Sequence, residues 1–170
     1  MAFDMTAAPQ DFSLPPGCAP KIRALYDYWR SIHPEAGLPG RQHFDPIDVP
    51  ELLPNIWMVD INREPLRFRF RLVGTAIVKF TERDATGQWL DAVYPDYWNS
   101  DAAAYHRACA LDGTPAYRKS HATPPSGGPG SITGGDVESL TLPLAGNGRD
   151  VDILLNMTLY PEDPVMEMER

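Results

Sequence analysis

Two blocks of alternating residues constrain the fold of this chain more than any other feature. In the first block, "RFRFRLVG" at 67–74 alternates three arginines with two phenylalanines and a leucine, and it follows an apolar run at 56–62. The second block, 116–159, contains three more runs, the last two joined by Asn147 and Gly148. Side chains alternate between the faces of a strand, and Asn-Gly is typical of tight hairpins. We therefore expect five strands.

The segments between and before these blocks have helical patterns. Residues 75–113 contain short helical segments and then a longer helix, so the helices interrupt the strands once and do not alternate with them. This order indicates an α+β fold, with a five-stranded antiparallel sheet that carries a helical cluster on one face and an N-terminal helix. We divide the chain into a flexible lead-in (1–19), an N-terminal helix (20–34), a core domain (35–160) and an acidic tail (161–170).

The charge balance limits the partners that we expect. The 15 Lys and Arg residues against 23 Asp and Glu residues give a formal net charge of −8, which opposes binding to nucleic acid or to an anionic membrane. The N-terminus does not have the pattern of a secretory signal, and no run approaches the length of a membrane span. We expect a cytoplasmic protein with no nucleic-acid or membrane partner.

The N-terminal helix has one apolar stripe that must be covered. The spacing of its apolar residues places them along one helical face, and such a face packs either on the chain's own sheet or on a second copy. We favour a homodimer formed through this helix, with intramolecular packing as the alternative. The residues of the stripe are Ile22, Leu25, Tyr26, Trp29 and Ile32.

Several segments, taken in order, resemble a PAS domain. "TGQWLDAVYPDYW" is similar to the PAS turn, short helix and Pro-Asp joint, and "ALDGTPAYRKSH" is similar to the end of the long PAS helix and the third strand. "LYDYWRSI", "IDVPELLPNIWMVDI" and "FRFRLVGTAI" resemble a bacterial branch of small stand-alone proteins with one PAS domain and an N-terminal helix. The resemblance covers about residues 21–160.

This resemblance implies a sensory or regulatory role without catalysis. Such a domain binds a small ligand or a signalling partner, for example a histidine kinase or a regulator, and passes its signal by protein–protein contact. A pure interaction scaffold with a filled core is the alternative. A small enzyme that uses the same cavity is a third possibility, because tyrosines, His106 and Cys109 are present, although no acid that would orient them is evident.

The aromatic residues around the helical cluster are our candidates for a ligand cavity. In a PAS fold these segments line the space between sheet and helices, where aromatic rings give stacking surface or simply fill the core. We expect the arginines of "RFRFRLVG" on the outer face, beside the N-terminal helix or a second subunit, and we expect Arg71 to be bonded to helix acids or loop carbonyls. Arg71 would anchor an anionic ligand only if the register were opposite. The candidates are Trp57, Phe68, Phe70, Arg71, Trp89, Tyr94, Trp98, Tyr105 and Tyr117.

We expect no cofactor and no metal. His106 lies roughly where haem-binding PAS domains carry their iron ligand, but we expect the long helix to bury Trp98, Ala102, Tyr105 and Cys109, with His106 at the edge. Cys109 invites comparison with light-sensing relatives, whose "NCRFLQ"-like flavin stretch is absent here. Haem through His106, or flavin, is therefore the less favoured possibility. The remaining histidines and the two cysteines are too scattered to indicate a metal site.

Overall fold

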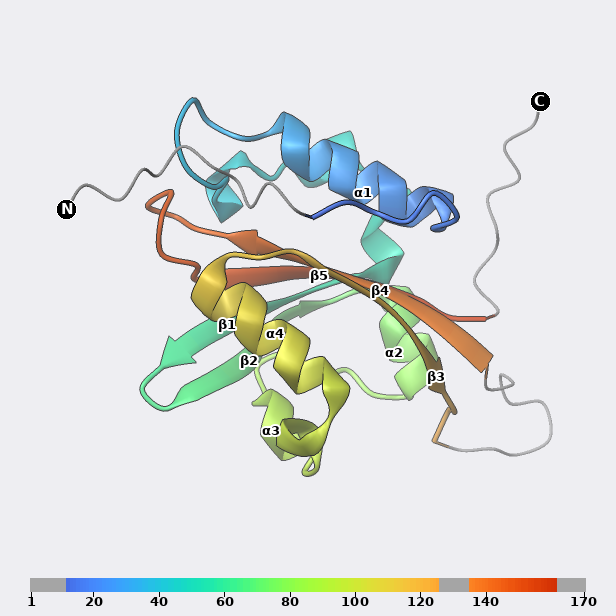
Figure 1. Cartoon of the computed structure of the whole chain (residues 1–170). Coiled ribbons are helices and arrows are strands. Elements are labelled where there is room, and N and C mark those ends of the chain that lie inside the picture. Colours follow the sequence, from blue (N-terminus) through green and yellow to red (C-terminus); the bar gives the residue numbers. More distant parts are fainter. Residues whose placement is uncertain (1–11, 126–134, 162–170) are drawn as a thin grey trace, which may run out of the picture.

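The computed structural model describes residues 12–125 and 135–161, and a five-stranded sheet runs through the centre of this part (Figure 1). The strands follow the order β2-β1-β5-β4-β3, and all neighbours are antiparallel. The predicted α+β fold is therefore confirmed. The strands are β1 (Ile56–Arg63), β2 (Leu66–Val73), β3 (Ala116–Ala122), β4 (Gly135–Leu144) and β5 (Ile153–Leu159).

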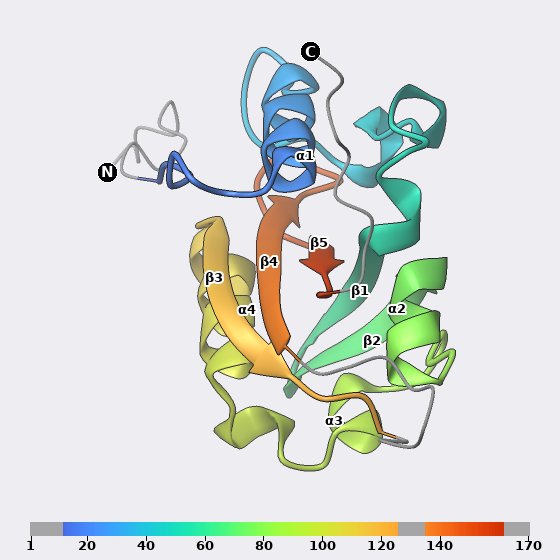
Figure 2. The same cartoon turned by 90° about the vertical axis from the view of Figure 1, so that its right-hand side faces the viewer.

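Helices cover both faces of this sheet. The N-terminal helix α1 lies on one side, and the helices between β2 and β3 lie on the other (Figures 1 and 2). Each side has its own cluster of buried apolar residues. The helices are α1 (Pro20–Ser31), α2 (Thr75–Thr81), α3 (Leu90–Val93) and α4 (Asp101–Asp112), with short 3-10 turns at Arg41–His43, Pro46–Asp48, Leu53–Asn55 and Tyr97–Asn99.

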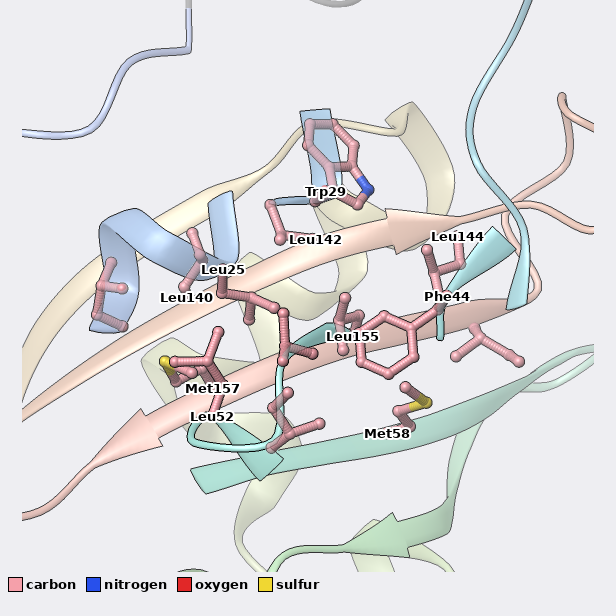
Figure 3. Close-up of a cluster of buried hydrophobic side chains, with 14 of the residues drawn as sticks. Leu25, Trp29, Phe44, Leu52, Met58, Leu140, Leu142, Leu144, Leu155 and Met157 are labelled. Carbon is pink, nitrogen blue, oxygen red and sulfur yellow. The ribbon is translucent and has the colours of Figure 1, made fainter. Parts of the chain in front are cut away.

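The apolar stripe of α1 packs on the chain's own sheet. Ile22 and Leu25 are fully buried, and Trp29 is 3% exposed. The indole Nε1 of Trp29, which is labelled in Figure 3, also donates a hydrogen bond to the Pro143 carbonyl over 3.0 Å. The prediction that this stripe is a dimer surface is therefore wrong, because β4 already occupies it. Tyr26 and Ile32, at its edges, are partly buried against the same cluster.

The cluster under α1, which we call the α1 core, is almost purely apolar. Alternate residues of the central strands β4 and β5 point into it, and burial of such side chains is the main source of folding free energy. Figure 3 shows the leucines of these strands meeting the side chains of α1 and of the turns before β1. Its fully buried strand residues include Met58, Leu140, Leu142, Leu144, Leu155 and Met157.

The expected lead-in and tail lie partly outside the described residues. Of the predicted lead-in 1–19, residues 12–19 are described, and they pack against the protein. Leu14 is 6% exposed in the α1 core, and the Phe12 ring meets the Tyr26 ring edge-on at 5.5 Å. The prediction of a flexible segment is therefore wrong for 12–19. Residues 1–11 and all of the tail except Pro161 are outside the described part.

The long helix α4 begins at Asp101, so Trp98, which we expected to be buried by this helix, lies before it. Ser100 is its N-cap, and its hydroxyl accepts a hydrogen bond from the Ala103 backbone N–H over 3.3 Å. The helix ends at Gly113, whose φ of 67° favours glycine. The buried residues of the helix are Ala103, His106, Cys109 and Ala110. The inner face thus includes His106, and the predicted stripe through Trp98 and Tyr105 is wrong, since both are exposed.

Candidate ligand-binding cavity

A cavity of about 1020 Å³ lies between the sheet and the helices α2 to α4. Its size is at the upper end of the range for small-molecule pockets, roughly 300–1,000 Å³. The sheet provides its floor, while the helices and the segments that join them provide its walls. Its main lining residues are Trp57, Phe70, Ile77, Phe80, Val93, Tyr94, Tyr97, His106, Arg118, Ser120, Val137, Ser139, Thr141, Asn156 and Thr158.

The floor is polar, and the strand register explains how its side chains meet. Arg118 on β3 pairs with Ser139 on β4, which in turn pairs with Thr158 on β5. These three residues form one row across the sheet, which we call the Arg118 row. Directly paired residues have Cβ atoms about 5 Å apart, so the row places Ser139 next to Arg118 and Thr158 one strand further along. A parallel row contains Thr141 and its partner Asn156.

Hydrogen bonds fix part of this floor. The Thr141 hydroxyl donates to Asn156 Oδ1 over 2.7 Å, and both residues are buried. Trp57 Nε1 donates to Thr158 Oγ1 over 2.9 Å, which holds the indole against the sheet. Because Thr158 uses its oxygen as the acceptor in that bond, its own hydroxyl proton is available to a further acceptor.

Arg118 has no bonded partner among the described residues. No hydrogen bond or ion pair joins its guanidinium to another side chain there, and the hydroxyls of Ser120 and Ser139 are equally unpaired in that part of the chain. No described buried side-chain nitrogen or oxygen lacks a hydrogen-bond partner, so these unpaired groups are open to the cavity and are not sealed in the core. Within the described part of the chain, the floor therefore presents a cation and hydroxyls without partners.

A buried pair, Tyr97 and His106, forms the inner wall. The Tyr97 hydroxyl and His106 Nδ1 are joined by a 2.8 Å hydrogen bond, and the imidazole is 5% exposed. Burial, and secondarily the charge of Arg118, lowers the pKa of His106 to about 3. Burial also raises the pKa of Tyr97 above its usual range. Both groups are therefore neutral near pH 7, and the protonated phenol can donate to Nδ1 when the ring proton is on Nε2.

Aromatic rings surround this pair. The His106 ring is 5.6 Å from Trp57 and 6.0 Å from Phe68, both edge-on, and Trp57 is 5.7 Å from Phe70. Aromatic pairs at these separations and angles are favourable beyond their burial alone. The rings thus make a firm wall next to the polar floor.

Apolar side chains from the helices complete the cavity opposite the floor. Ile77 and Phe80 of α2 and Val93 of α3 are buried there, and Tyr94 is 46% exposed beside them. Apart from Arg118 on the floor, the Asp, Glu and Arg residues of the described lining lie toward the solvent side, where Glu82, Arg83, Asp96 and Asp101 are exposed. The cavity thus has a polar, cationic floor and an apolar roof.

Three of the nine predicted cavity residues line this cavity, namely Trp57, Phe70 and Tyr94. The prediction is wrong for the other six. Phe68 is buried behind the wall, where its ring stacks on Trp98 at 5.9 Å. Trp98 and Tyr105 are partly exposed on the helical side, at 39% and 42%. Tyr117, Trp89 and Arg71 lie elsewhere on the sheet.

The contacts of Tyr117 show which face of β3 is turned toward the cavity. The hydroxyl of Tyr117 donates to Glu138 over 3.1 Å on the α1 side, so its neighbour Arg118 faces the cavity. A strand residue and its neighbour always occupy opposite faces. We predicted Tyr117 in the cavity because it is aromatic, but its neighbour on β3, Arg118, lines the cavity instead.

The three arginines of "RFRFRLVG" lie on the outer side of β2, as we expected. Arg67 forms a two-point ion pair with Asp91, with a shortest distance of 2.7 Å, and Arg69 Nε donates to the Gly87 carbonyl over 2.8 Å. Arg71 is bonded over 3.1 Å to Asp60 of the neighbouring strand β1, with both side chains well exposed, so the expectation of a helix acid or a loop carbonyl as its partner is wrong. Arg71 therefore anchors nothing in the cavity.

Trp89 packs within the same outer cluster. The Arg67 guanidinium lies 4.3 Å from the centre of the Trp89 ring, which is a favourable cation–π distance. The Asp91 carboxylate also accepts a hydrogen bond from Trp98 Nε1 over 3.1 Å. Its hydrogen bonds to Arg67 are the main cause that lowers the pKa of Asp91. Trp89 thus belongs to a structural cluster at the edge of the sheet.

Sequence reasoning missed the polar floor, although a signal for it was present. In "LLNMTLY" at 154–160, Asn156 and Thr158 interrupt a strand that is otherwise apolar. Both strand faces are buried, and a polar residue is seldom buried without a reason. Polar residues within these strands, including Arg118 and its partner Ser139, indicate the cavity better than the number of aromatic residues near the helices does.

The place of Cys109 and the distribution of possible metal ligands bear on the cofactor prediction. Cys109 is fully buried beside Leu154 in the helical-side core and does not line the cavity, and burial raises the pKa of its thiol. Within 12–125 and 135–161, no cluster of three or more His, Cys, Asp or Glu residues could hold a metal ion. No helix in these ranges is both long and apolar enough to cross a membrane.

A comparison with protein families agrees with this architecture. A family model described as "PAS domain" matches residues 19–157. The search of curated proteins found no match. Among solved structures, the Rhodobacter sphaeroides LOV protein is similar at 11% identity and a TM-score of 0.48, covering 82% of this chain and 68% of that chain.

Two further solved structures are similar at comparable levels. A point variant of RsLOV shares 10% identity at a TM-score of 0.46, covering 69% of this chain and 68% of that chain. An RNA-binding light-oxygen-voltage receptor shares 13% identity at a TM-score of 0.46, covering 88% of this chain but only 36% of that chain.

Proposed function

Because the chain belongs to the PAS domain family, we propose that it is a sensory or regulatory module that binds a small molecule in its cavity. The signal would pass by contact with a protein partner, such as a histidine kinase or a regulator. The observation that carries this proposal is the cavity of about 1020 Å³ with a polar floor. PAS domains are generally sensory, so a cavity of this size and polarity is the feature most directly suited to ligand binding.

The cavity favours a ligand over a scaffold with a filled core. A protein interior is close-packed, so a space of this size between sheet and helices is not needed for stability. The floor also places Ser139, Thr158 and Arg118 where apolar residues would stabilise a purely structural core better. A scaffold would gain nothing from them.

The geometry does not favour catalysis. His106 is the one buried titratable base of the described cavity lining, and a pKa lowered to about 3 makes it a poor proton acceptor near neutral pH. Its Nδ1 is bonded to Tyr97, so no carboxylate orients the ring through that nitrogen. We therefore propose that Tyr97 and His106 shape the cavity and take no part in a reaction.

Our expectation that the chain uses neither flavin nor haem stays a prediction. Cys109 packs away from the cavity, so its thiol could not join a flavin placed there. His106 does line the cavity, but its Nδ1 is bonded to Tyr97, which leaves only Nε2 for an iron. An absorbance spectrum of the purified protein tests both points, because haem and flavin each absorb visible light.

A cytoplasmic location and a homodimer also stay predictions. The apolar stripe of α1 no longer supports the dimer, because it is buried on the sheet of the same chain. The size of the protein in solution, measured by native mass spectrometry, tests it directly.

A cavity-filling variant tests the proposal. We expect native mass spectrometry of the wild type to show a copurified small molecule, and Ser139→Leu, which fills space on the floor, to lose it. Lys119→Leu is the matched control, since Lys119 is an exposed residue on the other face of β3. Both variants should fold, as circular dichroism would show. Identical ligand retention in both variants would contradict the proposal.

A further inference from the structure

The geometry of the floor points to the chemical class of the ligand. We propose that the cavity binds a small molecule with a single carboxylate and an apolar or aromatic body, and that Arg118 anchors the carboxylate. This inference rests on the proposed function, because it names what the same cavity binds. It is carried by one unpaired cation, its neighbouring hydroxyls and the apolar roof opposite them.

Arg118 is a charged group that the described protein leaves uncompensated. It is partly buried on the floor, and none of the ion pairs of the described residues includes it. The other arginines of the strands all have partners. Arg67 and Arg71 each pair with a carboxylate. Arg63 and Arg69 each donate to a backbone carbonyl. Taking a guanidinium partly out of water is costly unless an anion compensates it. A ligand anion would supply that missing partner.

The neighbours of Arg118 suit a carboxylate. A guanidinium has a planar fork of donors that matches two carboxylate oxygens. Ser139 lies directly beside Arg118 in the sheet, and Thr158 is next in the same row. Both hydroxyls can donate, Thr158 because its oxygen already accepts from Trp57. The Arg118 row therefore offers several donors in one place and no competing carboxylate.

The charge count favours one negative charge. Within the described lining, Arg118 is the one arginine of the floor. At the exposed side, the three acids Glu82, Asp96 and Asp101 outnumber the single arginine there, Arg83. A phosphate group with two charges would leave one charge unmatched and would be repelled by these acids. A monocarboxylate is neutralised by Arg118 alone.

The apolar roof of the cavity determines which chemical groups suit the rest of the ligand. Ile77, Phe80 and Val93 are buried on the helical side, opposite the polar floor. A ligand whose carboxylate meets Arg118 must place its body among these side chains and beside Trp57. An aliphatic or aromatic body gains free energy there by leaving water, whereas a sugar or an amino group would lose hydrogen bonds.

The test compares three probes that differ only in the head group. Isothermal titration would measure binding of 4-phenylbutyrate, 4-phenylbutanamide and 4-phenylbutylamine to the full chain. We expect the carboxylate to bind at least about tenfold more tightly than the amide, since a charged hydrogen bond contributes roughly one such factor or more, and the amine to bind weakest. Wild-type protein would also be extracted and any copurified molecule identified by mass.

Variants separate the anchor from the fold. Arg118→Gln should lose the preference for the carboxylate, with at least about tenfold weaker binding, and should keep its affinity for the amide. Arg118→Lys keeps the charge without the fork and should fall between. Arg71→Gln is the matched control, because it removes an arginine from the outer face and should bind like the wild type. Melting temperatures would show that all variants fold.

The outcomes distinguish this inference from the proposed function. Equal affinity for carboxylate and amide, or an Arg118→Gln variant that binds carboxylate like the wild type, would overturn the anchor and leave ligand binding intact. A copurified molecule without a carboxylate would do the same. If no probe binds and nothing copurifies, both proposals fail.

Discussion

The two faces of the sheet differ although the same strands build both. On β5, Leu155 and Met157 face α1 and are fully buried, while Asn156 and Thr158 face the cavity. On β4, Leu140 and Leu142 likewise alternate with Ser139 and Thr141. The α1 side is a packed apolar core, whereas the other side combines a second apolar cluster with a polar floor below an open space. One sheet thus separates a layer that provides stability from a layer available for function.

This separation suits a sensor. A packed face tolerates little change, because removing buried atoms leaves a cavity that the surroundings fill only partly. A floor that already borders an open space can exchange one polar side chain for another without that cost. The comparison therefore predicts unequal effects of substitutions at neighbouring positions, depending on which face each side chain occupies.

The largest expected effect is on the packed face. Leu155 is completely buried in the α1 core, where it is paired with Met58 and Leu142 on the neighbouring strands. Leu155→Ala should lower the free energy of unfolding by about 3 kcal/mol, because it loses apolar contact and opens a cavity. Urea unfolding monitored by fluorescence measures this. An exposed control, Lys119→Ala, should change it by less than about 0.5 kcal/mol; a loss as small in Leu155→Ala would contradict the packed core.

The sequence predicted the sheet well because strand patterns are local. Alternation in "RFRFRLVG" and the Asn147-Gly148 turn were enough to place the strands and the hairpin, since burial of one face determines the register. The dimer prediction failed because a stripe such as that of α1 shows that something covers it, but not what. Only the tertiary structure shows that β4 does so.

The site was predicted poorly for two physical reasons. A pattern of alternation does not say which face of β3 meets the helices, so Tyr117 was expected where Arg118 lies. In α4, alanines occur on several sides, so the apolar contrast is weak and the buried face cannot be read from it. The true inner face includes His106, about one residue away from the predicted stripe.

The second largest expected effect concerns how the stability of the protein depends on pH. The pKa of His106 is about 3 in the folded protein, below its usual 6.5, so the unfolded chain binds more protons between these values. The stability of the wild type should therefore fall as the pH falls from 6.5 toward 3, by at most about 1.4 kcal/mol per pH unit from this group. Urea unfolding at pH 7.5, 6, 5 and 4.5 measures this.

The matched variant for that series is His106→Asn. Its amide oxygen can accept from Tyr97 where Nδ1 did, but it does not titrate. Below pH 6 the difference between wild type and variant should shrink steadily, while between pH 7 and 8 it should stay constant. Parallel curves over the whole range would show that His106 is not held neutral by burial.

The smallest effect sharpens the comparison most, because it concerns two neighbouring positions of the floor. Ser139→Ala removes a hydroxyl that is unpaired within the described structure and open to the cavity, so the free energy of unfolding should change by less than about 0.5 kcal/mol. Thr141→Val, two residues along β4, should cost about 1–2 kcal/mol, because it leaves the buried Asn156 Oδ1 without its donor. Unfolding curves of both variants, recorded together without ligand, give the difference. A large loss in Ser139→Ala would mean that this hydroxyl is a structural partner, and the Arg118 row would then be part of the core and not free for a ligand.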